Sequence, residues 1–474
     1  MNPSLPLCVD LDGTLLATDC LWESFVQGLK QNPFIAFLVP FWLLRGKAYL
    51  KNRLARGTDF DVNSLPENPR FIKWLASQVA NERDIYLVSA SDQALVSAVA
   101  DEFGIFKEAI GSSEGLNLRG KYKADYLVDR FGEGGFDYAG NDFPDLRIWE
   151  KSHASILVHP VPRLLKRVPD ANRRVIVEDR PSIPVAFIKA MRPHQWMKNL
   201  LIFVPLLTAH VWQNVDAWVS SVLAFFSFSL CASAVYLIND LADLLSDRLH
   251  NTKRNRPFAS GSLPLYYGLI GAPFLFAFGF LIMIFANLSG LSVLGVYMVA
   301  TCLYSFWLKQ VAGVDIVVLA GLYTLRLVLG GFVVEVVISD WLLAFSMFFF
   351  LSLAMVKRFS ELYNIKEENR ERVAGRAYLA SDLNLMAMLG SCSGYLSVLV
   401  LALYVSSEHV TNLYRDPKWI LLVCPVMLIW VTRLWLETHR GRMDEDPILF
   451  AIKDGFSYGT IVVMLIITLL ASPI

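Results

Sequence analysis

The chain lacks several features that would assign it to a common class of protein. Its 474 residues include six cysteines, which stand singly, without the paired spacing of a zinc site or the density of a disulfide-stabilised domain. Basic and acidic residues both number 43, so the formal net charge is zero and the overall balance indicates no nucleic-acid partner. The opening residues also lack the basic and apolar pattern of a signal peptide, and we expect this part of the chain to stay in the cytoplasm.

Length and hydrophobic content indicate a protein in two parts. The chain is too long for one ordinary domain, and 55% of its residues are hydrophobic. About nine stretches long enough to span a bilayer recur towards the C-terminus: 195–214, 216–239, 265–286, 289–308, 312–335, 340–356, 383–405, 418–436 and 455–473. Basic residues crowd the loops on one side of these spans, which is the cytoplasmic side by the positive-inside rule.

We therefore expect a multi-domain protein. An α/β domain occupies 1–160, a basic and proline-containing linker follows at 161–187, and an all-α membrane domain of about nine helices occupies 188–474. In a bacterium the chain would be a multi-pass protein of the inner membrane, with its N-terminal domain and its sites on the cytoplasmic side.

Strands and helices alternate in the N-terminal part, which predicts a doubly wound, Rossmann-type sheet. A short apolar run ends at Val9 and is followed by Asp10 and Asp12, two carboxylates at the end of a strand. A second apolar run, Ile85–Val88, ends in Ser89 and precedes a helical segment. Other polar side chains that follow short apolar runs are Lys121, Lys123, Asn141, Asp142 and Asp145.

In this order the four pieces resemble the haloacid dehalogenase superfamily of phosphatases, whose first motif, DxDGT, is present at residues 10–14. The resemblance covers roughly residues 5–160 and implies that Asp10 is the nucleophile that forms an aspartyl phosphate, with Asp12 as general acid and base. It also implies that Ser89 holds the phosphate and that Lys123, or Lys121, neutralises it. The implied magnesium ligands are Asp10, Asn141 and Asp145.

One position departs from that family pattern. Asn141 stands where the family usually has an aspartate, and an amide is a weaker ligand for Mg²⁺ because it carries no charge. Asp142 is the alternative ligand. The domain is therefore either an active phosphatase or a vestigial or regulatory one.

A mostly helical insertion at about 21–80 has the position of a small cap over the phosphatase site. It contains the apolar run Phe34–Leu44, which is too short to span a bilayer of about 30 Å and is followed by several basic residues. Two interpretations are open: the run rests on the membrane surface, or it is an ordinary packed helix of the cap.

The segment 236–261 carries the strongest signal for chemistry in the C-terminal part. Four potential ligands of a hard cation recur at three- or four-residue spacing: Asn239, Asp240, Asp243 and Asp247. If the helix continues, they share one face. Three cations suited to phosphate follow: Lys253, Arg254 and Arg256. This is the composition of a site for magnesium and a diphosphate.

Charged residues near or inside other spans are costly unless they serve a site. Arg326 lies in the middle of the fifth span, and Lys357, Arg358 and Glu361 lie at the cytoplasmic end of the sixth. Arg192 and Lys198 stand at the start of the first span. We expect these side chains to contribute to the same site, rather than to topology alone.

Residues 188–474 resemble the UbiA family of intramembrane prenyltransferases, with the pattern NDxxDxxxD at 239–247 as the specific part. Within that family, RPHQWMKN at 192–199 and KRxxEL at 357–362 are similar to the branch that transfers phosphoribose to decaprenyl phosphate. A second aspartate-rich motif, typical of the aromatic prenyltransferases, is missing. Lys357, Arg358 and Glu361 stand in its place, which favours a donor with more phosphate to hold.

The expected reaction is the departure of a diphosphate from a carbon that becomes cationic. The resemblance and the residues together predict magnesium ligands at Asp240, Asp243, Asp247 and Glu361. The expected phosphate-binding residues are Arg192, Lys198, Asn239, Lys253, Arg256, Arg326, Lys357 and Arg358. The favoured substrates are phosphoribosyl diphosphate and a polyprenyl phosphate, with the N-terminal domain removing the 5-phosphate of the product.

Two alternatives remain. One is a prenyltransferase with a polyprenyl diphosphate donor and an aromatic or other acceptor. The other is a membrane protein that binds a polyprenyl lipid without catalysis.

Overall fold

The computed structural model describes residues 4–56, 62–113, 118–170, 172–367, 376–405, 417–443 and 446–471. The chain forms two compact units: the first is Met1–Arg192 with Tyr236–Phe274, and the second is Pro193–Val235 with Leu275–Ile474. The segment 236–274, which its sequence pattern groups with the membrane domain, thus belongs to the same unit as the N-terminal domain.

The first unit is built on a six-stranded parallel sheet with the order β3-β2-β1-β4-β5-β6. The strands are β1 (Leu7–Val9), β2 (Ile85–Asp92), β3 (Glu108–Ser112), β4 (Asp137–Gly140), β5 (Ala154–Val158) and β6 (Arg173–Ile176). The strand order reverses between β1 and β4, which is where ligands bind in open sheets of this kind. The sheet confirms the expected α/β fold with a doubly wound, Rossmann-type sheet.

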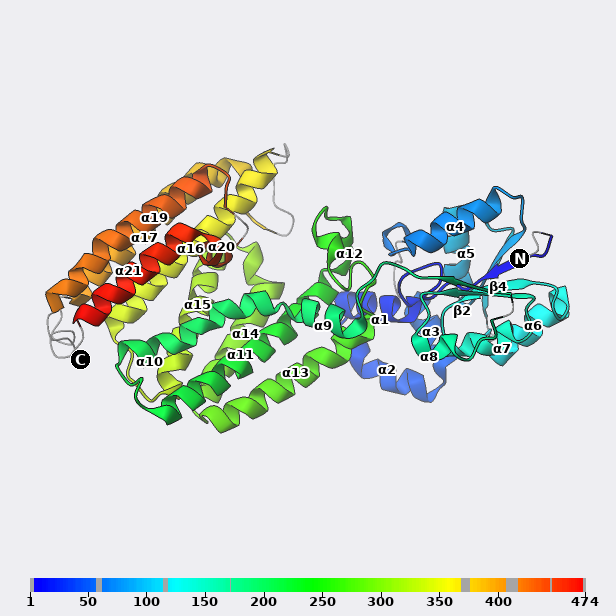
Figure 1. The fold of residues 1–474 in the computed structure, drawn as a ribbon, viewed down its shortest axis with the longest axis horizontal. Coiled ribbons are helices and arrows are strands. Elements are labelled where there is room, and N and C mark those ends of the chain that lie inside the picture. The colour runs from blue at the N-terminus through cyan, green and yellow to red at the C-terminus, as the bar shows by residue number, and fades with distance from the viewer. Residues whose placement is uncertain are drawn as a thin grey trace. The chain divides into compact units, whose positions relative to one another are not determined.

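Helices cover both faces of the sheet (Figure 1). Leu7 and Val9 face one apolar core, formed with the helices at 69–79 and 93–103. Cys8, between them, faces the other core, formed with the helices at 121–131, 146–149 and 162–165. The helical elements of this unit are α1 (Cys20–Gln31), α2 (Ile35–Leu44), α3 (Lys47–Arg56), η1 (Val62–Ser64), α4 (Pro69–Val79), α5 (Gln93–Phe103), α6 (Lys121–Phe131), η2 (Phe143–Asp145), α7 (Leu146–Trp149), α8 (Pro162–Leu165), α9 (Ile183–Met191), α12 (Leu244–Leu249) and η4 (Lys253–Asn255).

Part of the expected linker belongs to the sheet. Residues 173–176 form β6, which pairs with β5 at the edge, and α8 lies at 162–165. Arg173 and Arg174 in this strand suit an edge position, because charged side chains discourage pairing with further strands.

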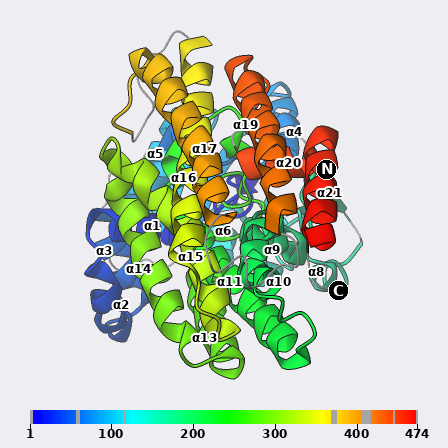
Figure 2. The same cartoon turned by 90° about the vertical axis from the view of Figure 1, so that its left-hand side faces the viewer.

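The second unit is helical. Its elements are η3 (Pro193–Phe203), α10 (Val204–Thr208), α11 (Val215–Ala242), α13 (Leu265–Ala286), α14 (Gly290–Phe306), η5 (Leu308–Gln310), α15 (Val314–Val333), α16 (Asp340–Glu367), η6 (Ala380–Asp382), α17 (Leu383–Val405), η7 (Pro417–Leu422), α19 (Val423–His439), α20 (Pro447–Lys453) and α21 (Gly455–Ala471). The last residues of α11 and the first residues of α13 belong to the first unit. In Figures 1 and 2, α16, α17 and α19 lie side by side.

Six helices in the described ranges are long and apolar enough to cross a membrane: Val215–Ala242, Leu265–Ala286, Val314–Val333, Asp340–Glu367, Ala380–Val405 and Lys418–His439. Two more of the predicted spans correspond to shorter apolar helices, α14 and α21. The predicted span at 195–214 is instead a 3-10 segment, η3, followed by the short α10. Its central proline, Pro205, lies in the first turn of α10, where a missing backbone N–H is tolerated.

Candidate functional site

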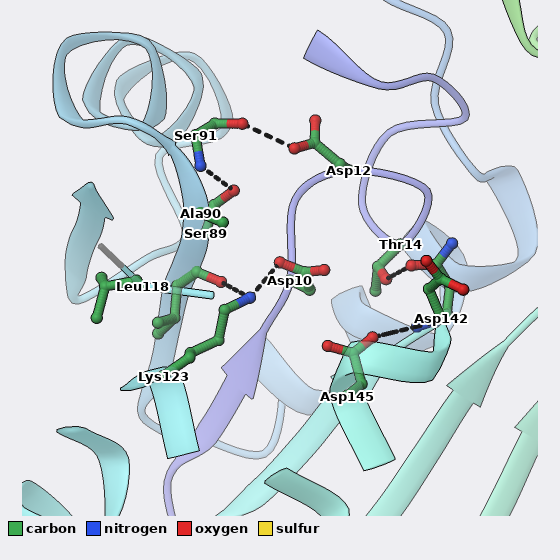
Figure 3. Close-up of polar contacts among 12 residues, drawn as sticks. Asp10, Asp12, Thr14, Ser89, Ala90, Ser91, Leu118, Lys123, Asp142 and Asp145 are labelled. Carbon is green, nitrogen blue, oxygen red and sulfur yellow. Dashed lines mark hydrogen bonds and ion pairs between the residues drawn. The ribbon is translucent and has the colours of Figure 1, made fainter. Parts of the chain in front are cut away.

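Asp10 and Asp12 lie at the carboxyl end of β1, the central position of the sheet (Figure 3). The Asp10 N–H donates to the Ala139 carbonyl at 2.9 Å, which fixes the start of the loop against β4. Gly13 has a φ of +75°, and a Cβ there would lie 2.1 Å from Asn141 Nδ2. Only glycine therefore allows both this turn and the approach of Asn141 to the loop.

Lys123, rather than Lys121, reaches the predicted nucleophile. Its buried ammonium lies 2.7 Å from Asp10 Oδ1 and also donates to the Val88 carbonyl at 3.2 Å and to the Tyr138 hydroxyl at 3.1 Å. Burial raises the pKa of Asp10 to about 7, although the Lys123 charge acts in the opposite direction. The charge of Lys123 thus stabilises the ionised form of this buried carboxyl group.

Asp12 is held by two donors. Its Oδ1 accepts from the Cys20 N–H at 2.8 Å, and its Oδ2 accepts from Ser91 Oγ at 2.7 Å (Figure 3). The Ser91 N–H in turn donates to Oγ of the fully buried Ser89 at 3.1 Å. The predicted phosphate-binding serine and the predicted general acid are therefore linked through Ser91, which our sequence analysis missed. The signal was available, because residues two apart in a strand share a face.

Asp145 organises the loop after β4. Its Oδ1 accepts from the Tyr138 hydroxyl at 3.0 Å, and its Oδ2 accepts from the N–H groups of Asn141 and Asp142 at 3.0 and 3.1 Å. Asn141 Oδ1 accepts from Thr14 Oγ1 at 3.4 Å. Asp10, Asn141 and Asp145 thus follow the ends of the two strands on either side of the switch point, and their oxygen atoms are of the kind that Mg²⁺ binds.

Asn68, which directly precedes α4, holds the loop after β1 in place. Its Nδ2 donates to the carbonyls of Gly13 at 3.0 Å and Thr14 at 2.7 Å, and its Oδ1 accepts from Arg180. Arg180 also donates to the Gly261 carbonyl at 3.3 Å. Neither Asn68 nor Arg180 carries a sequence signal for this role, since the contacts join segments far apart in the chain.

The acidic segment does not form one continuous helix. The helix α11 ends at Ala242, Asp243 stands at the break, and α12 begins at Leu244. The condition under which the four ligands would share one helical face, a helix that continues through them, is therefore not met. The Asp243 N–H still donates to the Asn239 carbonyl at 2.8 Å, and both side chains are half-buried.

Arg256 and Arg192 form ion pairs with the carboxylates on either side of this break. Arg256 Nη1 donates to Asp240 Oδ1 at 3.1 Å and to Asp247 Oδ2 at 2.6 Å, and Arg192 lies 2.5 Å from Asp240 Oδ1. Burial raises the pKa of Asp247, against the opposite effect of Arg256. Lys253 follows in η4 and is half-buried.

Nothing within the described residues gathers three or more acidic, histidine or cysteine side chains closely enough to hold a metal ion. One oxygen of the acidic segment is nevertheless unsatisfied: Asp240 Oδ2 is buried and has no hydrogen-bond partner among the described residues. A buried carboxylate oxygen without a partner is costly, and a cation would satisfy it. The donor set of this segment therefore fits Mg²⁺.

The acidic segment, residues 236–261, also contacts α1, the helix that follows the loop after β1, through a buried ion pair. Arg248 Nη2 lies 2.5 Å from Glu23 Oε1 and Arg248 Nη1 lies 3.2 Å from Glu23 Oε2, while Thr18 Oγ1 donates to Glu23 Oε1 at 2.6 Å. Gly261 has a φ of +68°, and a Cβ there would lie 2.5 Å from the Ala17 carbonyl oxygen. Sequence analysis did not find this contact, because Glu23 and Arg248 are 225 residues apart.

In the second unit Arg326 is enclosed. Its guanidinium lies between 5.0 and 5.3 Å from the ring centroids of Phe228, Tyr297 and Tyr323, and its Nε donates to Asn199 Oδ1 at 2.8 Å. These contacts account for an arginine inside a span, whereas its role in phosphate binding stays a prediction.

The predicted KRxxEL residues occupy a buried polar network. Arg358 donates to Asp315 Oδ2 at 2.6 Å, to Glu361 Oε2 at 2.5 Å and to the Tyr304 hydroxyl at 2.6 Å. Asp315 also accepts from Tyr378. Asp315, Tyr304 and Tyr378 were not predicted. Glu361, predicted as a metal ligand, pairs with an arginine here.

Lys198 and Lys357 are the remaining predicted cations of this unit. Lys198 forms an ion pair with Asp446, which was not predicted. Lys357 is half-buried on α16, and the charged groups that act on it include Lys198, Glu361 and Asp446. These side chains therefore form one charged cluster inside the second unit.

An apolar recess lies in the same unit, between α14, α15 and α16. It has a volume of about 320 Å³, and its lining is Ala300, Val318, Gly321, Leu322, Thr324, Leu325, Val328 and Met347. A lining of this kind suits a hydrocarbon chain.

Together these features define an integral membrane protein whose polar groups include two candidate phosphate-handling sites. Residues 200–453 match the UbiA prenyltransferase family, and the chain belongs to that family. The uncharacterized protein y4nM of Sinorhizobium fredii is 35% identical over 458 residues, which cover 96% of this chain and 88% of that one.

Two other relatives match a smaller part of the chain. Nodulation protein NoeC of Azorhizobium caulinodans is 33% identical over 279 residues, 58% of this chain and 89% of that one. A decaprenyl-phosphate phosphoribosyltransferase of Mycolicibacterium smegmatis is 38% identical over 284 residues, 56% of this chain and 86% of that one. The chain is thus a UbiA-type transferase that also carries an α/β unit with a six-stranded parallel sheet.

Proposed function

We propose that the protein transfers 5-phosphoribose from phosphoribosyl diphosphate to a polyprenyl phosphate and then removes the 5-phosphate from the lipid-linked product. One observation carries the proposal: the acidic segment and the loop after β1 belong to one compact unit, in which the buried Arg248–Glu23 pair joins the acidic segment to α1. The similarity to a relative named decaprenyl-phosphate phosphoribosyltransferase supports the choice of donor.

In the transfer step the bond between the anomeric carbon and the diphosphate breaks, and an oxygen of the lipid phosphate bonds to that carbon. Asp240, Asp243 and Asp247 would hold Mg²⁺, which when bound neutralises the charge that develops on the leaving diphosphate. Arg256 and Lys253 bind diphosphate oxygens. A phosphate monoester is already a nucleophile at neutral pH, so this step needs no dedicated base.

In the hydrolysis step Asp10 attacks the phosphorus of the 5-phosphate, and the bond from phosphorus to the ribose oxygen breaks. Asp12, oriented by Ser91 and the Cys20 N–H, gives its proton to the departing oxygen. Asp12 then takes a proton from the water that releases phosphate from Asp10. Lys123 holds Asp10 and balances charge on the phosphoryl group. Mg²⁺ held by Asp10, Asn141 and Asp145 would supply further positive charge when bound.

To test the proposal, the purified full-length protein is incubated in detergent with Mg²⁺, phosphoribosyl diphosphate and a polyprenyl phosphate. The lipid is then analysed by mass spectrometry. We expect a ribosylated lipid without a 5-phosphate. Asp243→Ala should abolish all ribosylated lipid, whereas Asp216→Ala, an exposed change in the first turn of α11, should not.

Asp10→Asn separates the two steps, because it removes the nucleophile and leaves the transferase segment intact. We expect the 5-phosphorylated lipid to accumulate in this variant. An unchanged product would contradict the second step alone, and no ribosylated lipid from the unaltered protein would contradict the first. A parallel incubation with a polyprenyl diphosphate and an aromatic acceptor tests prenyl transfer as the alternative.

A further inference from the structure

The helical insertion of the α/β unit contains an apolar helix, α2, which contacts α1 and α3 but leaves most of its side chains exposed. All ten residues of α2 are apolar, and none of them is buried. Phe37 is 72% exposed, Phe41 66% and Leu44 86%. Ten residues at about 1.5 Å each give about 15 Å, roughly half of the hydrocarbon core of a bilayer. The helix is therefore too short to span a membrane and too apolar for a surface that faces water.

The residues around α2 are exclusively basic among the charged types. From residue 33 to residue 56 the chain has three arginines and two lysines and no aspartate or glutamate. Arg45 and Arg53 are exposed and lie 5.5 and 5.7 Å from the centre of the Tyr49 ring, one from the end of α2 and the other from α3. An apolar segment flanked by cations and an aromatic ring is the composition of an interfacial element that binds anionic lipids.

The helix α3 connects this surface to the predicted phosphatase site. Leu50 and Leu54 of α3 are buried, whereas Lys51 from the same helix donates to the Ala90 carbonyl at 3.0 Å. Ala90 stands between Ser89 and Ser91 at the end of β2. The short helix α3 therefore connects α2 to the end of β2, which carries these two serines.

We propose that α2 inserts into the interface of an anionic lipid bilayer and holds the phosphatase site at the level of the headgroups. A bilayer is at hand, because the chain itself is an integral membrane protein. The substrate class that fits this placement is a phosphate monoester borne by a lipid whose chain stays in the membrane. The substrate class rests on the proposed function, whereas the bilayer contact does not.

The test places a photoreactive p-benzoylphenylalanine at one position at a time in the full-length protein in lipid nanodiscs. Phe37 and Phe41 are the test positions, and Tyr122 of α6, an aromatic residue of similar exposure at 68%, is the matched control. After irradiation, covalent adducts are identified by mass spectrometry. We expect lipid adducts at positions 37 and 41 to exceed those at 122 by at least about tenfold, as an insertion of 5–10 Å into the lipid would give.

Lipid composition sharpens the test. Adduct yield at 37 and 41 should rise when anionic lipid replaces zwitterionic lipid, and Arg45→Glu with Arg53→Glu should remove that dependence. Equal lipid labelling at 37 and 122 would overturn the proposal. So would crosslinks from position 37 to a second copy of the chain or to another segment of the same chain. Labelling does not require turnover, so its failure is distinguishable from a failure of the phosphoribosyl transfer.

Discussion

Two arginines of the acidic segment, Arg248 and Arg256, differ in how completely their carboxylate partners are satisfied. Arg248 and Glu23 form a buried bidentate pair to which Thr18 adds a third hydrogen bond. Arg256 divides its contacts between Asp240 and Asp247, and Asp240 keeps one buried oxygen without a partner among the described residues. The carboxylate of Glu23 has both oxygen atoms paired, whereas that of Asp240 has one oxygen atom that a ligand could bind. We infer that Arg248 stabilises the fold and that Arg256 belongs to the reaction.

The largest expected effect is on stability and comes from breaking the buried Arg248–Glu23 pair. Arg248→Met leaves the carboxylate of Glu23 buried without a cation, and breaking a buried pair in this way costs about 3–5 kcal/mol. The free energy of unfolding of the α/β unit, followed by chemical denaturation, should fall by that amount. Arg248→Met combined with Glu23→Gln should recover most of the loss, because no buried charge then remains.

The matched control is an exposed pair of the same chemistry. Arg130 and Glu108 form an ion pair whose side chains are 32% and 45% exposed. Arg130→Met should change the free energy of unfolding by at most about 1 kcal/mol, because water screens such pairs. An equal loss in both variants would contradict the view that burial decides the effect.

The second prediction concerns the rate of ribosyl transfer instead of the free energy of unfolding. Arg256→Met removes the cation between Asp240 and Asp247 and should lower the rate of ribosyl transfer about 100-fold, the usual cost of losing one donor to a developing negative charge. Quenched-flow analysis of the ribosylated lipid measures it. Stability should also fall, because Asp247 is buried and loses this cation, whereas Asp240 keeps its pair with Arg192. A variant with normal transfer and a large loss of stability would assign Arg256 to the fold instead.

The sequence was most informative where the candidate site residues directly follow a strand. The apolar runs that end at Asp10 and Ser89 are strands of the sheet, and the carboxyl ends of parallel strands meet at one edge. The identity of the lysine was open between two candidates, and the position of α6 after Gly120 brings Lys123 to Asp10. In these cases the local pattern and the fold agree.

Features that depend on tertiary contacts could not be predicted from the sequence. The three- and four-residue spacing of the acidic ligands is compatible with a continuous helix, and only the structure shows the break at Asp243. The Arg248–Glu23 pair and the Asn68 hydrogen bonds join segments far apart in the chain, so no local pattern announces them. Asp446 and Tyr378 are found for the same reason only through their partners, Lys198 and Asp315.

The smallest expected effect concerns Asp12 in the candidate phosphatase site, a carboxylate whose two oxygen atoms both accept hydrogen bonds. Ser91→Ala removes the hydrogen bond to Asp12 Oδ2 and leaves the Cys20 N–H as the donor to Oδ1. One hydrogen bond to a charged group is worth about 1.5 kcal/mol, so the rate of 5-phosphate release should fall about tenfold. Because Ser91 acts through Asp12, the pH dependence of kcat should also shift. Ser97→Ala, a change on α5 at a hydroxyl that accepts from Gln93, should alter neither the rate nor its pH dependence. Equal effects of the two substitutions would show that Ser91 supports the strand end rather than orienting Asp12.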